Sequence, residues 1–394
     1  MAAGPESPPR RARLPLPRLV YVLGAVSFAT DLASEMIVPL LPALLATLGG
    51  SLLHLGLLQG VSDLVVAALK IQSGRLSDRQ RRRRPWILFG YGLSSLARPL
   101  FAVVATPLQA LLVRVVDRVG KGLRSAPRDA LLTAAVPIDQ RGHAFGVQRS
   151  LDHAGALAGA LVASGLLALG WSLRTVFAFS LLPGLAAVAL IGFAVRDIEA
   201  PPPAQSAPEP LRRTPGLTPA LGVVALSAIS GGVDLFALAH AERLGVPLAM
   251  LPLLWAVLHT SRSLLAAPLG KASDRLGRKR VLALGLAGQA LVLVGFAAVD
   301  TAVWCWPLFL LLGLHAAFTE GAERGLIADL TGQHRRGTAF GIFHAVQGLA
   351  AFTGASLLGA LADAYGLSGC FLAAAAAALL GLLVSTGVPA RSAR

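Results

Sequence analysis

The sequence predicts an all-α membrane protein in which twelve transmembrane helices form two similar halves of six. Apolar residues make up 55% of the chain and charged residues only 14%, whereas soluble domains carry about 25% charged residues. Apolar runs of about 20 residues, enough to cross a bilayer as a helix, recur along the whole chain. Runs such as residues 371–384 are continuous and do not alternate, so they exclude a membrane β-barrel.

Two motifs occur twice at nearly the same offset. The pattern G-x-x-S-D-R, followed by a basic cluster, begins at Gly74 and again at Gly270, 196 residues later. The pattern R-G-x-A-F-G begins at Arg141 and again at Arg336, 195 residues later. Two matches at one offset indicate an internal duplication.

The first half begins with a Pro- and Arg-rich segment, residues 1–18, which we expect to be a disordered cytoplasmic tail. The first apolar run contains Asp31 and Glu35 and has no suitably placed cleavage site, so it is predicted to be an uncleaved transmembrane helix. It opens a six-helix bundle over residues 19–195. The other five helices are expected at about residues 52–73, 86–105, 111–130, from about 143 onward, and 173–195.

A second bundle follows a linker. Residues 196–217 are rich in Pro, Ala, Glu and Arg, which is typical of a flexible connection. The second bundle is expected over residues 218–388, with a short tail at 389–394. Its helices are predicted at about residues 218–241, 248–269, 281–300, 303–328, 337–362 and 367–388.

The distribution of cations predicts the orientation. The basic loops 74–85 and 271–280 fall on the same side as both termini when six helices precede and six follow the linker. Cytoplasmic loops carry an excess of Lys and Arg. We therefore expect both termini and the linker to be cytoplasmic. The preponderance of Arg over Lys suggests a GC-rich bacterial genome, which places the protein in a bacterial inner membrane.

The stretch at residues 111–130 carries charges at three- and four-residue steps, which lie on one face of a helix. A charge at mid-bilayer costs at least about 2.5–3.5 kcal/mol on insertion scales. Such a stripe is either an ion-paired structural helix or the lining of a translocation path, and the general rule for intramembrane charges favours the path. The candidate substrate or proton-pathway residues are Asp31, Glu35, Asp63, Arg98, Arg114, Asp117, Arg118, Lys121, Arg149, Asp152 and Glu320.

Several other functions are disfavoured. The net charge of +15 resides in short loops between apolar segments, so it does not indicate nucleic-acid binding. The sequence lacks the P-loop, the H-E-x-x-H zinc motif and the G-x-S-x-G hydrolase motif. Its two cysteines lie within apolar segments and show no metal or redox spacing. We therefore expect no enzymatic activity, no metal and no cofactor.

The repeated basic motif resembles the signature of the major facilitator superfamily, and the resemblance covers the whole chain. It implies two six-helix bundles around a central cavity that opens alternately to each side of the membrane. The signature contacts are then expected to hold the cytoplasmic side closed. One difference is that Arg81 stands in the first copy where the second has Gly277. The residues to which the resemblance assigns this gating role are Gly74, Asp78, Arg79, Gly270, Asp274 and Arg275.

A second, shorter pattern resembles one that the same superfamily associates with proton coupling. It comprises Arg118, with Gly122 and Ala126 at four and eight residues further on. Arginine does not release its proton near neutrality, so it would act on a neighbouring acid. In the next predicted helix, Gly155 and Gly159 form a small-xxx-small pair that predicts close helix packing.

These observations predict a secondary active transporter of a small solute, acting by alternating access as a monomer in lipid and coupled to protons. The excess of cations on the 111–130 stretch suits an organic anion or zwitterion. If the intramembrane acids neutralise those cations, an apolar cavity for drug efflux is the alternative. A non-transporting membrane receptor or scaffold on the same fold is a third. Sodium is the alternative coupling ion, and the sequence does not determine the direction of transport.

Overall fold

The computed structural model describes residues 16–80, 82–137, 140–197, 216–331 and 336–389. The predicted tails over residues 1–15 and 390–394 and most of the predicted linker, residues 198–215, lie outside the described residues. So do the side chains of Asp78, Arg79 and Asp274.

The first half contains six crossings, several of them interrupted. The first crossing is broken at Pro39 and Pro42, because proline cannot donate the hydrogen bond that continues a helix. The elements are α1 (Arg18–Glu35), η1 (Val38–Leu40), α2 (Leu41–Thr47), α3 (Leu52–Gln80), α4 (Arg84–Ala97), η2 (Arg98–Ala102), α5 (Pro107–Ala134), α6 (Arg141–Ala168), α7 (Leu173–Phe179) and α8 (Leu181–Ala194).

The second half repeats this plan. The longest helix, α14, contains a turn at Gly366, whose φ of 76° and ψ of 174° are not helical, so α14 makes two crossings. The elements are α9 (Leu217–Gly231), α10 (Asp234–Arg243), η4 (Leu248–Met250), α11 (Leu251–Leu276), α12 (Arg278–Ala298), η5 (Ala302–Trp304), α13 (Cys305–Leu330) and α14 (Arg336–Ser385).

Nine helical stretches of the described chain are long and apolar enough to span a membrane. The doubled α14 counts once among them, and the crossings formed by α4 with η2 and by α5 are not included. Helix α5 carries the charged stripe, which makes its mean hydropathy too low. With these three additions the structure has the twelve-helix architecture that the sequence predicts.

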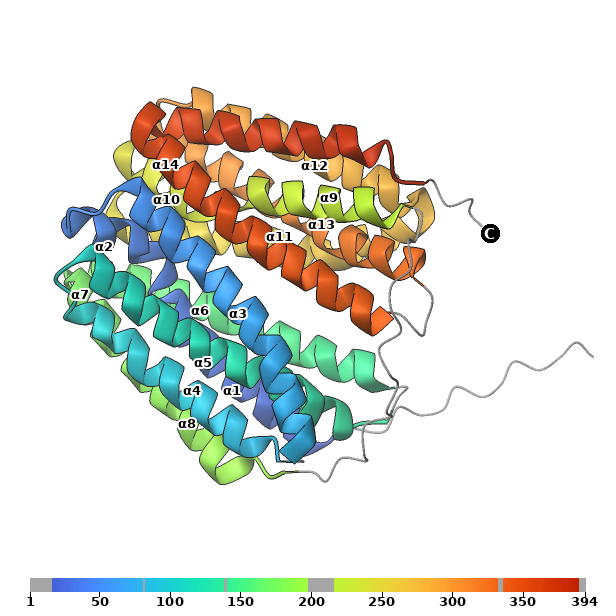
Figure 1. Cartoon of the computed structure of the whole chain (residues 1–394). Coiled ribbons are helices and arrows are strands. Elements are labelled where there is room, and N and C mark those ends of the chain that lie inside the picture. The colour runs from blue at the N-terminus through green and yellow to red at the C-terminus, as the bar shows by residue number, and fades with distance from the viewer. Residues whose placement is uncertain (1–15, 81, 138–139, 198–215, 332–335, 390–394) are drawn as a thin grey trace, which may run out of the picture.

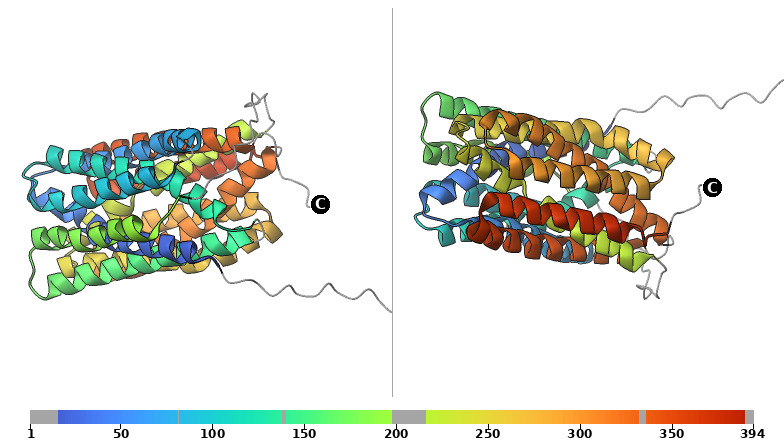
Figure 2. Two further views of the ribbon diagram at one scale, coloured as in Figure 1. Left: turned by 90° about the horizontal axis from the view of Figure 1, so that it is seen from below. Right: turned by 90° about the horizontal axis from the view of Figure 1, so that it is seen from above.

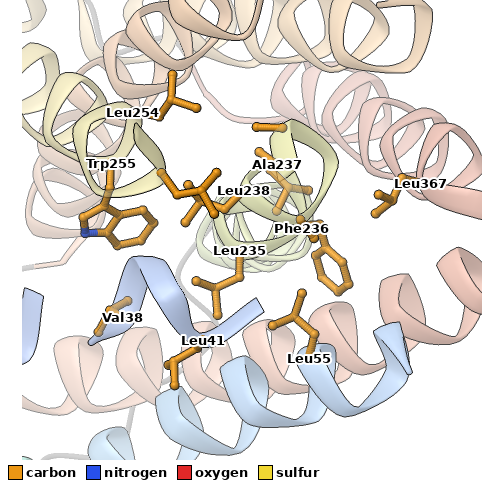
Figure 3. Packing of buried hydrophobic residues seen from close by; sticks show 14 of the residues in the cluster. Val38, Leu41, Leu55, Leu235, Phe236, Ala237, Leu238, Leu254, Trp255 and Leu367 are labelled. Atoms are coloured by element: carbon orange, nitrogen blue, oxygen red, sulfur yellow. The ribbon is translucent and has the colours of Figure 1, made fainter. Parts of the chain in front are cut away.

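The two halves lie side by side, with α1–α8 in one and α9–α14 in the other, and the helices run roughly along one direction (Figures 1 and 2). Three clusters of buried apolar side chains hold them. Two clusters belong to one half each: one joins α1, α4, α5, α6 and α8, the other α9, α12, α13 and α14. The third is shared by both halves and includes Leu55, Phe236, Leu254 and Leu367 (Figure 3).

The shared core lies at the end of the molecule occupied by α2, α7 and α10, opposite the end where the described chain approaches its termini (Figure 1). We call these the far end and the termini end. The apolar clusters near the termini end do not cross between the halves. The halves are therefore joined at the far end and have separate cores at the other.

Glycines allow the two halves to approach along α3 and α14. A Cβ at Gly60 would lie 2.8 Å from the carbonyl oxygen of Phe352, and one at Gly359 would lie 2.7 Å from that of Leu52. Only a residue without a side chain fits at such a distance.

Within the first half, Gly155 and Gly159 of α6 pack on the backbone of α1 at Phe28 and Leu32. A Cβ at Gly155 would lie 2.8 Å from the Cα of Phe28. The close helix packing predicted from this small-xxx-small pair is confirmed.

Candidate functional site: a charged central cavity

A cavity of about 1910 Å³ lies between the two halves. Helices α3 and α5 form its wall on the first half, and α9 to α14 form its wall on the second. It reaches Gly74 near the end of α3 and Thr338 near the start of α14, so it extends toward the termini end. At the far end the shared apolar core closes it.

Both walls contribute charged side chains. The first half supplies Asp63, Lys70, Arg118 and Lys121, and the second supplies Asp234, Arg262, Glu320 and Glu323. The formal charges are +2 on the first wall and −2 on the second. The formal charges of these residues therefore sum to zero over the whole cavity, but the first wall is positive and the second is negative.

Of the candidate pathway residues predicted from the sequence, Asp63, Arg118, Lys121 and Glu320 line this cavity. Asp63 is half-buried and accepts a hydrogen bond from Gln59 Nε2 at 3.2 Å. Glu320 is ion-paired with Arg262, so those two charges compensate each other. Lys121 makes no ion pair within the described residues, which leaves its ammonium available to the cavity.

Three other candidates do not line the cavity: Arg114 and Asp117 on α5, and Arg98 on η2. Asp117 is completely buried, and its carboxylate meets three guanidinium groups. The distances are 3.0 Å to Arg98 Nε, 2.6 Å to Arg118 Nη2 and 3.5 Å to Arg114 Nη1. These residues form the paired structural cluster that the sequence left open as the alternative, and only Arg118 belongs both to it and to the cavity wall.

The outer turns of α5 are engaged in a second set of contacts. Arg124 lies over the ring of Tyr91, 4.0 Å from its centroid. Arg128 is paired with Asp129 at 2.9 Å and donates a hydrogen bond to Ser27 Oγ at 3.2 Å. Cations on this part of α5 therefore bind α4 and α1.

The candidates on α6 are also outside the cavity wall. Asp152 is buried and accepts hydrogen bonds from Gln148 Nε2 at 2.9 Å on both oxygens. Arg149 lies 3.6 Å from Asp152, and its side chain is 61% exposed. Gln148 also donates to Ser27 Oγ at 3.1 Å. This group joins α6 to α1.

The two acids of α1 differ from each other. Glu35 accepts a hydrogen bond from the indole Nε1 of Trp255 at 2.6 Å, which links α1 of one half to α11 of the other. Asp31 is half-buried, and Lys121 and Arg124 are among the charges that act on it. Neither acid is part of the cavity wall.

The gating motif is described in part. A Cβ at Gly74 would lie 3.3 Å from Cβ of Ala126, so α3 and α5 pack closely here. At Gly270, by contrast, a Cβ would meet no atom of the described residues within 4 Å. Arg275 is exposed. Helix α11 ends at Leu276 and is followed by Gly277, whose φ of 92° favours glycine.

Apart from Glu320, the candidates predicted from the sequence all lie in the first half, yet the second half also contributes acids to the cavity wall. Asp234 and Glu323 were missed as cavity residues. An available signal was that each acid lies within a predicted membrane span, and an intramembrane acid is a functional candidate by default. Asp234 also follows Gly231 and Gly232, where the span breaks between α9 and α10.

Comparisons with known proteins agree with this architecture. The sequence model of the Major Facilitator Superfamily matches residues 23–319 and 220–393. An uncharacterised MFS-type transporter of Methanocaldococcus jannaschii is 29% identical over 367 residues, covering 88% of this chain and 89% of that protein. A multidrug resistance protein of Yersinia enterocolitica, MdtG, is 26% identical over 386 residues, covering 93% and 92%.

Solved structures share the fold. A bacterial homologue of the human lysosomal transporter Spinster superposes with a TM-score of 0.76 at 16% sequence identity. The match covers 94% of this chain and 97% of that one.

Proposed function

The chain belongs to the major facilitator superfamily, and we propose that it is a proton-coupled secondary transporter that carries a small charged organic solute by alternating access. The observation that carries this proposal is the cavity, which is lined by charges from both halves and closed at the far end by a core that both halves share. Separating that core and joining the termini ends would present the same wall residues to the other side of the membrane.

The structure corresponds to an inward-open state if the termini end is cytoplasmic. The basic loops flanking the ends of α3 and α11 support that orientation through the positive-inside rule. In this state a solute enters the cavity from the cytoplasm or leaves to it. The proposal fits either import or export.

Asp63 is our choice for the proton-binding acid. It is the candidate acid of the first half that lines the cavity, and its neighbours Arg118 and Lys121 line the same wall. Among the described residues it accepts a hydrogen bond from a neutral amide, Gln59, and forms no ion pair that protonation would break. A proton on Asp63 would remove one negative charge from this wall. The wall would then attract an anionic group more strongly.

The test uses the purified protein in liposomes with an imposed pH gradient. We expect wild-type uptake to follow the gradient, and Asp63→Asn to lose gradient-driven accumulation while retaining exchange of solute across the membrane. Asp300→Asn, which removes an exposed acid in the turn before η5, is the matched control. If accumulation by Asp63→Asn still follows the pH gradient, Asp63 is not the proton-binding acid.

The cations on the first wall favour anions or zwitterions as substrates, because Lys121 is unpaired in the described chain and Arg118 lies beside it. The likeness to the multidrug resistance protein supports drug efflux as a second candidate. The liposome experiment separates them. Exchange of organic anions or zwitterions supports the first, and exchange of lipophilic cations alone supports the second.

A further inference from the structure

At the cavity, the second half carries buried oxygen atoms for which the described part of the chain offers no hydrogen-bond partner. Glu323 Oε1 on α13 and Gln289 Oε1 on α12 belong to residues that line the cavity, whereas Ser230, whose Oγ on α9 is the third such atom, is not a lining residue. Glu323 is 4% exposed, and Gln289 and Ser230 are fully buried. A buried polar atom left without a partner costs about 1–3 kcal/mol, so such atoms are rare unless something else satisfies them.

These residues gather at one place. Gln289 Nε2 donates to the carbonyl oxygen of Ser230 at 3.2 Å. Glu323 lies within hydrogen-bonding reach of the side chain of Ser227. Because Ser227 and Ser230 are three residues apart on α9, Glu323 and Gln289 flank the same turn of that helix. Asp234, at the start of α10, is a third carboxylate of the same wall, with Glu320 and Glu323.

The free atoms on Glu323 and Gln289 are acceptors, and the group that matches them is a cationic donor. A primary ammonium has three N–H donors and no acceptor. Arg262, the arginine of this wall, is already ion-paired with Glu320 and does not satisfy these acceptors. Arg324 follows Glu323 in sequence, is exposed and does not belong to the cavity wall. The acceptors of this wall are therefore open to a ligand.

The opposite wall presents the complementary charge. Lys121 is unpaired within the described chain, and Arg118 is bound to Asp117 through its Nε and Nη2 atoms. Both line the cavity. A solute with an anionic group at this wall and an ammonium at the other would satisfy both walls at once.

We propose that the transported solutes are zwitterions with a primary ammonium held by Glu323 and Gln289 and an anionic group facing Arg118 and Lys121. This inference rests on the proposed transport function and narrows its substrate class. It excludes simple anions as the preferred cargo, because they would leave the acceptors of the second wall unsatisfied.

The test measures binding to the purified full-length protein by thermal stabilisation, since a ligand of the native state raises its apparent stability. The probes are glycine, γ-aminobutyrate, ε-aminohexanoate and dialanine, each beside its N-acetyl derivative. We expect at least one zwitterion to stabilise the wild type and its N-acetyl derivative to do so far less. Glu323→Gln, which keeps the shape and removes the charge, should weaken binding of that zwitterion by about tenfold or more.

Asp300→Asn should bind as the wild type does. The comparison of each zwitterion with its N-acetyl derivative needs no variant, so it stands even if Glu323→Gln folds poorly. Equal binding of a zwitterion and its N-acetyl derivative overturns the inference, as does stabilisation by the N-acetyl monoanions alone. Unchanged zwitterion binding in a folded Glu323→Gln protein, with only the pH response of transport altered, also overturns it.

Failure of the proposed function gives a different result. In that case the zwitterion binds with the expected dependence on Glu323 but is not moved across a liposome membrane. If only solutes that lack an ammonium are transported, the proposed transport function is supported and the inference about zwitterions is contradicted.

Discussion

At the scale of single residues, the burial of Asp117 determines what the charged stripe of α5 does. One carboxylate with no exposed surface is shared by Arg98, Arg114 and Arg118. Arg98 also donates to the carbonyl oxygen of Thr30 at 3.0 Å, which joins η2 to α1. Buried guanidinium groups require such partners, because an uncompensated buried charge costs several kcal/mol. Much of the stripe therefore holds helices together, and Lys121 is left for the cavity.

We expect Asp117→Asn to destabilise the protein by about 3–5 kcal/mol, because it removes the charge that three buried arginines share. The measurement is thermal unfolding in detergent. Asp129→Asn is the control on the same helix. Its pair with Arg128 is partly exposed, so its loss should cost only about 0–1 kcal/mol. Equal stability of the two variants would show that Asp117 is not the structural centre of the cluster.

At the scale of elements, two carboxylates accept hydrogen bonds that link one half to the other. The carboxylate of Asp363 on α14 accepts the backbone N–H of Leu52 at 2.7 Å and of Leu53 at 3.0 Å. It therefore caps the N-terminus of α3 from the other half, where the helix dipole favours a negative charge. The bond from Trp255 to Glu35 is a second link between the halves. Both must break if the far end opens.

We expect Asp363→Ala to shift the protein toward a state open at the far end. Loss of an N-cap costs about 1 kcal/mol, which corresponds to about a fivefold change in the equilibrium. The measurement is the maleimide labelling rate of Leu55→Cys, a buried residue of the shared core, in a protein whose Cys305 and Cys370 are replaced by alanine. Asp300→Asn should leave this rate unchanged. A rate in Asp363→Ala equal to that of its parent would show that the cap does not hold this end closed.

At the scale of the whole molecule, the positions of the apolar cores indicate which end of the cavity is closed. One core spans both halves at the far end, and each half has its own core toward the termini end. Rigid six-helix units with a separable contact surface can rock against each other without losing their own cores. This division is what an alternating-access cycle needs.

The orientation of the molecule can be tested with two single cysteines in the same alanine background. Arg275→Cys lies at the exposed end of α11, toward the termini end, and Asp300→Cys lies in the turn at the far end. We expect a membrane-impermeant maleimide to label Asp300→Cys in intact cells and Arg275→Cys only after permeabilisation. The reverse pattern would invert the topology and make the structure outward-open.

Much of the architecture could be read from local properties of the chain. Helix existence and order follow from the length of the apolar runs, since in lipid every backbone polar group must be bonded within its own segment. The expected span at 303–328 corresponds to η5 and α13, and that at 367–388 to the second part of α14. The duplication at offsets of 195 and 196 residues by itself indicates two similar halves.

The site could be predicted only in part, because spacing places a charge on a helix face without saying what lies opposite it. Arg114 and Lys121 belong to one predicted stripe, yet Arg114 is buried against Asp117 and Lys121 faces the cavity. The sequence by itself determined the membrane class, the order of the helices and the charged face of α5, because these depend on composition and local periodicity. Only the tertiary structure decided which charges pair and which meet at the cavity. Pairing depends on contacts between helices that are distant in sequence, such as those of Glu35 with Trp255 and of Gln289 with Ser230.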